Sequence, residues 1–280
     1  MSEKCSTCPS SAGCTIDPTT CQTEEQNTLV GSLNHVRNVI AVMSGKGGVG
    51  KSSVSGLIAA ELAKSGNKVG VLDADITGPS QPRAFGIPAG IGLKATEYGI
   101  IPPLATHGIK VISVNFFLPN EDDPVVWRGP MLAGAVKQFW GEVDWGELDY
   151  MIVDLPPGTG DVPLTVLQSL PISGLVIVSS PQDLAAMVVK KTIKMAQKMN
   201  IPIIGLVENM SYAICPSCTE KLEIFGKSQG EQVAKASGID FLGGLPWDMK
   251  LNDLIDHGKI VEYKSPDISN IVEKIVGKLP

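Results

Sequence analysis

The segment that most constrains this chain is a glycine-rich loop placed between an apolar run and a helical pattern. The loop, SGKGGVGKSS at residues 44–53, follows the run VIAVM and precedes Leu57, Ile58 and Leu62, which recur at helical spacing. It fits G-x-x-x-x-G-K-[ST], in which backbone N–H groups point at phosphate oxygens and the following helix adds its positive N-terminal end. This succession predicts a phosphate-binding site in an α/β fold. A glycine-rich turn without a ligand would not require the flanking strand and helix.

Each position of the loop has an expected role in binding ATP and Mg²⁺. Lys51 should reach the β- and γ-phosphates, and Ser52 should bind Mg²⁺. The glycines let the main chain wrap around the phosphates. The predicted ATP-binding residues of the loop are Gly45, Lys46, Gly47, Gly48, Val49, Gly50, Lys51, Ser52 and Ser53.

Four more apolar runs, short and rich in Val and Ile, follow along the chain: KVGVLD, YMIVDLP, GLVIVSS and IPIIGLVEN. Most precede a helical segment, and the clearest helical pattern covers residues 184–199. Continuous apolar strands alternating with helices indicate a parallel sheet covered on both faces. Residues 98–116 instead predict a strand pair that could be antiparallel. Residues 267–279 predict a helix docked on the core, with a membrane-surface helix as the alternative.

Acidic side chains follow two of these runs. Asp73 and Asp75 end VLDAD, and Asp154 ends the run IVD. The carboxyl ends of parallel strands meet beside the nucleotide crevice. We expect Asp154 to hold Mg²⁺ through water, and Asp73 and Asp75 to help position Mg²⁺ and the attacking water. Asp161 could instead cap a helix, and Asn209 is placed to read the adenine base.

Hydrolysis of ATP needs little beyond an oriented water, the metal ion and lysines, so no separate nucleophile is expected. The predicted catalytic residues are Lys46, Lys51, Asp75 and Asp154.

Charge and hydropathy narrow the class of partner. The net charge of −6 argues against nucleic acid, because phosphate binding requires a basic surface. No apolar run reaches the roughly 18 residues that span a bilayer, and the N-terminus lacks the apolar core of a signal peptide. We therefore expect a cytoplasmic protein without a membrane partner. In that reducing compartment, six cysteines with CxxC-like spacing indicate metal or redox chemistry.

Cys215 and Cys218 form one CxxC pair in ENMSYAICPSC. The residues around them, Pro216, Ser217 and Thr219, indicate a loop rather than a core strand with two buried thiols. A thioredoxin-type redox pair would begin a helix after a strand, and NMSYAI looks too irregular for that strand. Thiolates suit both zinc and iron–sulfur clusters. Because two cysteines are half of a four-thiolate site, the spacing predicts a site shared between two subunits, for either metal.

The N-terminal residues 1–35 are polar and show no helical or strand period. We expect a flexible tail that stays disordered unless a cofactor orders it. It contains Cys5, Cys8, Cys14 and Cys21. Residues 36–280 are then the ATPase domain, with the CxxC loop near 215–218.

Five motifs occur together in this chain: MSGKGGVGKSSVS, VLDADITGPS, VVWRGPML, WGELDYMIVDLPPGTGD, and ENMSY before the CxxC. With these motifs, the chain resembles the Mrp/ApbC/Nbp-type iron–sulfur cluster carrier ATPases over roughly residues 36–265. These belong with ParA and MinD among the deviant Walker A proteins, whose mark is a lysine in the place of Lys46. The resemblance implies a three-layer P-loop NTPase with a mainly parallel central sheet flanked by helices. It also implies that Lys46 reaches the nucleotide of a homodimer partner; otherwise Lys46 is a solvated loop lysine.

The resemblance further implies a function: slow ATP hydrolysis coupled to binding a [4Fe–4S] cluster and delivering it to apo-proteins. Cys215 and Cys218 of both subunits would hold this cluster, and zinc could replace it in isolated protein. The tail spacing C-x2-C-x5-C of Cys5, Cys8 and Cys14 resembles the second cluster site of the Nbp branch. That branch has a further cysteine upstream, whereas this chain has Cys21 downstream. The nucleotide roles of the family fall on Lys46, Lys51, Ser52, Asp73, Asp75, Asp154 and Asn209.

Two other functions use the same nucleotide core. A positioning ATPase of the ParA or MinD kind would need a basic DNA-binding face or a basic amphipathic C-terminal helix, and no cysteines. An electron-transfer ATPase like the nitrogenase iron protein carries its cluster cysteines singly and far apart, not as CxxC.

Overall fold

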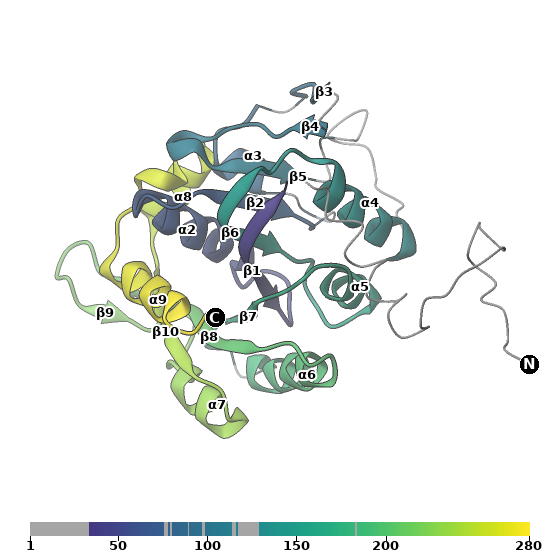
Figure 1. Ribbon diagram of the computed structural model, residues 1–280. Coiled ribbons are helices and arrows are strands. Elements are labelled where there is room, and N and C mark those ends of the chain that lie inside the picture. The colour runs from purple at the N-terminus through teal and green to yellow at the C-terminus, as the bar shows by residue number, and fades with distance from the viewer. Residues whose placement is uncertain are drawn as a thin grey trace, which may run out of the picture.

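The computed structural model describes residues 34–75, 78, 80–88, 90–96, 99–113, 116, 129–182 and 184–280 (Figure 1). Cys5, Cys8, Cys14 and Cys21 lie outside these residues, so the predicted tail cluster stays a prediction. Asn34 and His35, assigned above to the tail, are part of the folded domain. The Asn34 side chain accepts hydrogen bonds from the backbone N–H groups of Trp145 and Gly146 and donates to the Val143 carbonyl.

The core of the domain is a parallel sheet. Its strand order is β10 (Phe241–Trp247), β8 (Ile203–Ile214), β7 (Gly174–Ser179), β1 (His35–Ser44), β6 (Glu147–Asp154), β2 (Val69–Asp73) and β5 (Lys110–Ser113). Every neighbouring pair in this order is parallel. The short strand β9 (Lys221–Leu222) runs antiparallel to the end of β8. The predicted mainly parallel sheet is confirmed.

Helices cover both faces of this sheet (Figure 1). One face carries α2 (Lys51–Lys64), α3 (Gln81–Ala84), α8 (Met249–Asp256), the 3-10 turn η3 (Ile260–Glu262) and α9 (Pro266–Val276). The other carries α4 (Gly129–Glu142), α5 (Asp161–Ser169), α6 (Leu184–Lys198) and α7 (Gly230–Ser237). A further 3-10 turn, η1 (Thr106–Gly108), precedes β5.

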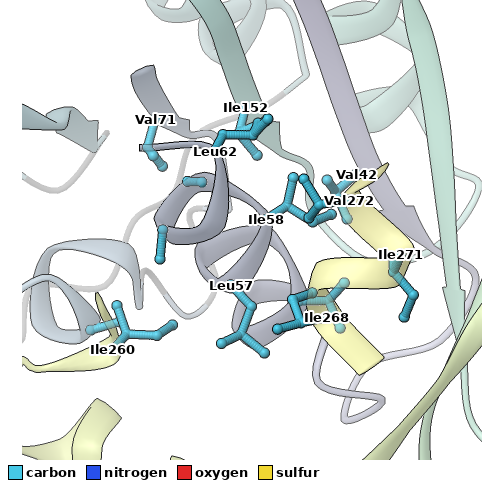
Figure 2. Packing of buried hydrophobic residues seen from close by; sticks show 14 of the residues in the cluster. Val42, Leu57, Ile58, Leu62, Val71, Ile152, Ile260, Ile268, Ile271 and Val272 are labelled. Atoms are coloured by element: carbon cyan, nitrogen blue, oxygen red, sulfur yellow. The ribbon is translucent and has the colours of Figure 1, made fainter. Parts of the chain in front are cut away.

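The alternation of side chains along β1 shows why the strand is apolar throughout. Ile40 and Val42 enter the core beneath α2 and α9, whereas Ala41 and Met43 enter the core beneath α4, α5 and α6. Successive strand residues point to opposite faces, so a strand covered on both sides must be apolar at every position. Figure 2 shows the first core, where Ile58 of α2 and other apolar side chains pack between the sheet and α9.

The predicted elements correspond to the structure with two differences. The five apolar runs are β1, β2, β6, β7 and β8, and the helical pattern at residues 184–199 corresponds to α6, which ends at Lys198. Within the described residues of 98–116, pairing is limited to one antiparallel bridge between Leu104 and Lys110. β4 (Gly99–Ile101) is antiparallel to the upstream β3 (Lys94–Thr96), whereas β5 joins the central sheet. NMSYAI is a strand, because β8 continues through residues 209–214, but it is irregular as expected: the pairing with β10 shifts register between Glu208 and Tyr212, and Met210 has a positive φ of 58°.

The C-terminal segment forms α9 and is docked on the core, as predicted. Ile268, Ile271 and Ile275 are buried. The helix begins at the Ser265 cap, whose hydroxyl accepts the Asp267 N–H, and Pro266 occupies the first turn, where no N–H partner is needed. Among the helices of the described residues, none combines the length and the hydropathy needed to cross a bilayer.

Candidate functional site

The glycine-rich loop joins β1 to α2 at the carboxyl end of the sheet, and its glycines are sterically required. Gly50, the residue before α2, has φ 75° in the left-handed region, and a Cβ there would collide with the Asn209 amide. Gly48 also has a positive φ, of 81°. A Cβ on Gly45 would collide with Val188 of α6. The loop can therefore hold this path only with glycine at these positions.

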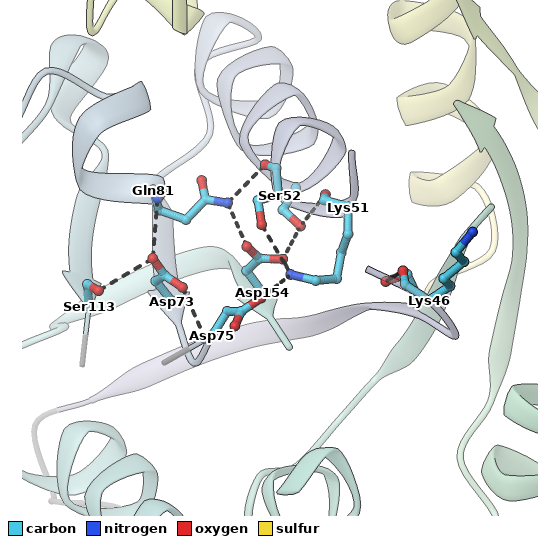
Figure 3. Close-up of polar contacts among 10 residues, drawn as sticks. Lys46, Lys51, Ser52, Asp73, Asp75, Gln81, Ser113 and Asp154 are labelled. Atoms are coloured by element: carbon cyan, nitrogen blue, oxygen red, sulfur yellow. Dashed lines mark hydrogen bonds and ion pairs between the residues drawn. The ribbon is translucent and has the colours of Figure 1, made fainter. Parts of the chain in front are cut away.

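Lys51 lies in the middle of a buried cluster of charges (Figure 3). Its Nζ is 2.6 Å from Asp154 Oδ1 and 3.4 Å from Asp75 Oδ2, and it donates to Ser52 Oγ at 3.1 Å. The Lys51 side chain is only 5% exposed, and that of Asp154 is fully buried. The structure thus brings together Lys51, Ser52, Asp75 and Asp154 as the sequence predicted. The Lys51 ammonium group forms ion pairs with both carboxylates.

Asp73 lies next to this cluster at the end of β2. Its carboxylate accepts hydrogen bonds from the N–H groups of Asp75 at 3.1 Å and Gln81 at 3.2 Å, and from Ser113 Oγ at 3.4 Å. Complete burial, followed by the nearby charge of Asp154, raises the pKa of Asp73 to about 8. This favours the protonated acid at neutral pH, so Asp73 holds the backbone around the site rather than adding another full negative charge.

Two residues of the site were not found from the sequence. Ser55 Oγ donates to Asp154 Oδ1 at 2.9 Å, and Gln81 Nε2 donates to Asp154 Oδ2 at 2.9 Å. Ser55 had a signal, because it lies four residues after Lys51 and therefore on the same face of α2. Gln81 had none, since it reaches the site only through the packing of α3.

Lys46 is not part of this cluster. Its side chain is exposed and points away from the carboxylates (Figure 3), and its Nζ donates to Gln182 Oε1 at 3.1 Å. The backbone carbonyl of Lys46 accepts the Ser44 hydroxyl at 3.0 Å. The backbone of the loop at Lys46 is therefore held by Ser44, while the Lys46 ammonium group faces outward.

Asn209 and Asp161 have roles that differ in part from those expected. The buried Asn209 amide donates to the Val49 carbonyl at 3.0 Å and so ties β8 to the glycine-rich loop; its reading of adenine stays a prediction. Asp161 is the first residue of α5, and Gly160 occupies the cap position. Its carboxylate therefore acts on the helix dipole instead of capping the N–H groups.

The CxxC pair lies in the turn between β8 and β9. Cys215 is partly exposed and Cys218 is exposed, both as free thiols. The turn is closed by the Cys215 N–H donating to the Glu220 carbonyl and the Thr219 N–H donating to the Cys215 carbonyl, both at 2.9 Å. The backbone N–H groups of Cys218 and Ser217, and then the Cys218 thiol, lower the pKa of Cys215. The predicted loop is confirmed, and the chain returns into β9 instead of starting the helix of a redox motif.

The donor atoms fit the predicted ligands. The Asp154 carboxylate and Ser52 hydroxyl are the hard oxygen donors that Mg²⁺ prefers, and the exposed thiols suit iron–sulfur clusters or zinc. Among the described residues, no group of three or more His, Cys, Asp or Glu side chains could hold a metal ion. The thiol pair therefore remains half of a four-thiolate site within the described part of one chain.

A family model described as the NUBPL iron-transfer P-loop NTPase, within ParA, matches residues 35–280. The chain belongs to this family. The match spans the whole domain, from the first residue of β1 to the C-terminus, and agrees with the resemblance found in the sequence.

Relatives of the NUBPL-type chain are named "Iron-sulfur cluster carrier protein". The one from Clostridium perfringens is 46% identical over 267 residues, covering 93% of this chain and 91% of the relative. The one from Methanocaldococcus jannaschii is 43% identical over 284 residues, covering 98% and 97%.

A solved structure is similar to this NTPase over most of its length. It is a nucleotide-binding protein from Archaeoglobus fulgidus in complex with ADP, with Co found by PIXE. The TM-score is 0.75 at 43% identity, covering 87% of this chain and 93% of that one. The cell division ATPase MinD of Pyrococcus furiosus shares the fold, with a TM-score of 0.65 at 18% identity.

Proposed function

We propose that this protein is an ATP-dependent iron–sulfur cluster carrier. Two subunits hold a [4Fe–4S] cluster between them through Cys215 and Cys218 of each chain, and pass it to apo iron–sulfur proteins. The names of the relatives support the cargo, and the exposed CxxC turn supports its ready transfer. ATP hydrolysis regulates this delivery.

The observation that carries the proposal is that one strand connects the two sites. β8 holds the glycine-rich loop through Asn209, and the same strand ends where the CxxC turn begins at Cys215. Asn209 and Cys215 are separated by residues 210–214, where β8 contains a bulge and Met210 has a positive φ of 58°. A change in the loop on nucleotide binding can therefore be transmitted to the thiols through β8.

The residues of the nucleotide site have separate tasks in this reaction. Lys51 leaves Asp154 and Asp75 to bind the phosphates of ATP, because phosphate oxygens carry more negative charge. Ser52 and Asp154 would hold Mg²⁺, which supplies positive charge to the phosphates. Asp75, released from Lys51, orients the attacking water. Lys46 of the second subunit adds positive charge near the transferred phosphoryl group. The outward direction of the Lys46 side chain supports this role.

The docked C-terminal helix favours the carrier over a membrane-positioning ATPase. α9 packs Ile268, Ile271 and Ile275 into the core beside α2. An amphipathic helix used for membrane binding would need that apolar face for lipid.

The test is anaerobic reconstitution of the full chain, followed by transfer to an apo-acceptor. About two iron per subunit would fit a bridging [4Fe–4S] alone, and about six would fit a tail [4Fe–4S] as well. Replacing all four tail cysteines with serine separates these cases. Cys215→Ser should abolish the bridging cluster and its transfer, whereas Ser217→Ala, in the same turn, should retain both. Undiminished transfer by Cys215→Ser would reject the proposal.

A further inference from the structure

The two oxygens of the Asp154 carboxylate are held by different partners. Oδ1 accepts from Lys51 Nζ at 2.6 Å and from Ser55 Oγ at 2.9 Å. Oδ2 accepts from Gln81 Nε2 at 2.9 Å. Asp154 is fully buried at the end of β6. Gln81 is thus the side chain on the oxygen that faces away from Lys51.

Gln81 connects three parts of the site, as Figure 3 shows. Its Nε2 donates to the Ser52 carbonyl at 2.9 Å as well as to Asp154, and its backbone N–H donates to Asp73 Oδ2 at 3.2 Å. The first turn of α2, the end of β6 and the end of β2 therefore meet at this one residue, which has no exposed surface.

The orientation of the Gln81 amide follows from its neighbours. The Ser52 carbonyl and the Asp154 carboxylate can only accept hydrogen bonds, so the NH₂ group must face them. Oε1 is then buried, and no group among the described residues donates to it; an unpaired buried oxygen costs roughly 1–3 kcal/mol. A methionine would fill this space without that cost. Packing alone therefore does not explain why residue 81 has an amide side chain.

Helix α2 lies close to the Gln81 amide. A Cβ on Gly56 of α2 would lie 3.2 Å from Gln81 Oε1 and 2.7 Å from Ile260. The absence of a side chain at Gly56 creates the space that Gln81 occupies. The amide therefore lies between Asp154 and the first two turns of α2.

We propose that Gln81 is a positioning residue that orients Asp154 for Mg²⁺; this rests on the proposed binding of Mg²⁺ and nucleotide at the site. When phosphates attract Lys51, Asp154 loses its only cation within hydrogen-bonding distance among the described residues. One donor remains on each oxygen, Ser55 on Oδ1 and Gln81 on Oδ2. The carboxylate keeps its direction, and Gln81 ties that direction to Ser52, whose hydroxyl is the other predicted Mg²⁺ donor.

The test measures how Mg²⁺ changes the affinity for fluorescent ADP in the full-length protein. Gln81→Met keeps the approximate length of the side chain and removes the donor. ADP affinity in EDTA should stay within about twofold of wild type, while the Mg²⁺ concentration for half-maximal tightening should rise about 10–100-fold, as for other partners of metal ligands. Gln138→Met is the matched control: Gln138 is exposed on α4 and donates to Glu142, so neither quantity should change.

A second variant keeps the test decisive if Gln81→Met fails to fold. Gln81→Asn retains the amide but cannot reach Asp154, so it should show the same weakened response to Mg²⁺. A wild-type Mg²⁺ response in either folded variant overturns the proposal. So does an equal loss of ADP affinity with and without Mg²⁺, which would indicate a purely structural role. If wild-type protein binds ADP with no Mg²⁺ response, the proposed nucleotide function itself fails.

Discussion

At the scale of single residues, burial decides which ion pairs matter. Lys51 and Asp154 are removed from water, and the Lys51 ammonium group lies within 3.4 Å of the carboxylates of both Asp154 and Asp75. Lys68 and Glu147 form a pair of similar length, 3.0 Å, but both side chains are more than half exposed. Water screens the second pair, whereas the first stands in a medium where an uncompensated charge is expensive.

Removing the cation from each pair should therefore give very different results. Lys51→Met leaves the fully buried Asp154 carboxylate without the ammonium group that lies 2.6 Å away, and should lower the free energy of unfolding by about 3–5 kcal/mol. Lys68→Met should change it by about 1 kcal/mol or less. Urea denaturation of both variants at the same pH provides the measurement. Equal effects would show that the Lys51 cluster is neutralised in some other way, for example by protons.

At the scale of elements, the β8–β9 hairpin determines how the thiols are presented. Thr219, in the left-handed region at φ 62°, lets the chain turn back directly after Cys218. The hairpin is anchored below the turn: the Tyr212 hydroxyl donates to Asp267 of α9 at 2.7 Å, and the Lys221 ammonium lies 4.1 Å from the Tyr212 ring. The thiols therefore lie at the end of a short, supported loop.

This turn should make Cys215 reactive at lower pH than an ordinary thiol. Backbone N–H groups of Cys218 and Ser217 stabilise the thiolate and lower the pKa of Cys215. Alkylation proceeds through the thiolate, so the midpoint of its pH–rate profile for Cys215 in cluster-free protein should lie below that of cysteine in an unstructured peptide. Mass spectrometry of the peptide containing residue 215 follows the reaction. Urea-unfolded protein is the control, and an identical midpoint folded and unfolded would contradict the prediction.

At the scale of the whole molecule, the proposed function requires a second subunit at two places, the nucleotide site and the thiol pair. Lys46 faces outward from its own site, and the thiol pair supplies half of a four-thiolate set. A two-fold dimer places the same surface of each chain against the other. One such dimer can therefore complete both sites.

If Lys46 acts in the partner's site, Lys46→Ala should reduce ATP hydrolysis by roughly 10³-fold or more, as for other charges supplied in trans, and leave ADP affinity unchanged. Mixing Lys46→Ala subunits with Lys51→Met subunits gives the sharper result. A mixed dimer has one site with an intact Lys51 and an intact partner Lys46, so the mixture should regain hydrolysis. Two inactive proteins that stay inactive when mixed would show that Lys46 acts within its own chain.

Parts of the site whose residues lie close together in the sequence could be predicted, whereas contacts between residues far apart in the sequence could not. The glycine-rich loop, the carboxylates at strand ends and the CxxC turn are local patterns, in which a few adjacent residues define a backbone path and its chemistry. Asn34 was assigned to the tail, and the residues before Cys215 were not expected to form a strand, because the hydrogen bonds that hold both segments come from parts of the chain far away. The ligands of the tail cysteines stay a prediction.

The sequence by itself determined the parallel α/β fold, the phosphate loop and the pairing of the two thiols, because glycine conformation, apolar runs and residue spacing act locally. Only the tertiary structure decided which side chains surround Asp154. Ser55 and Gln81 are 99 and 73 residues away from it along the chain, and the sheet order and the packing of α3 bring them within 3 Å. It also decided that β8 connects the nucleotide loop to the thiols, since the partners of a strand depend on the whole sheet.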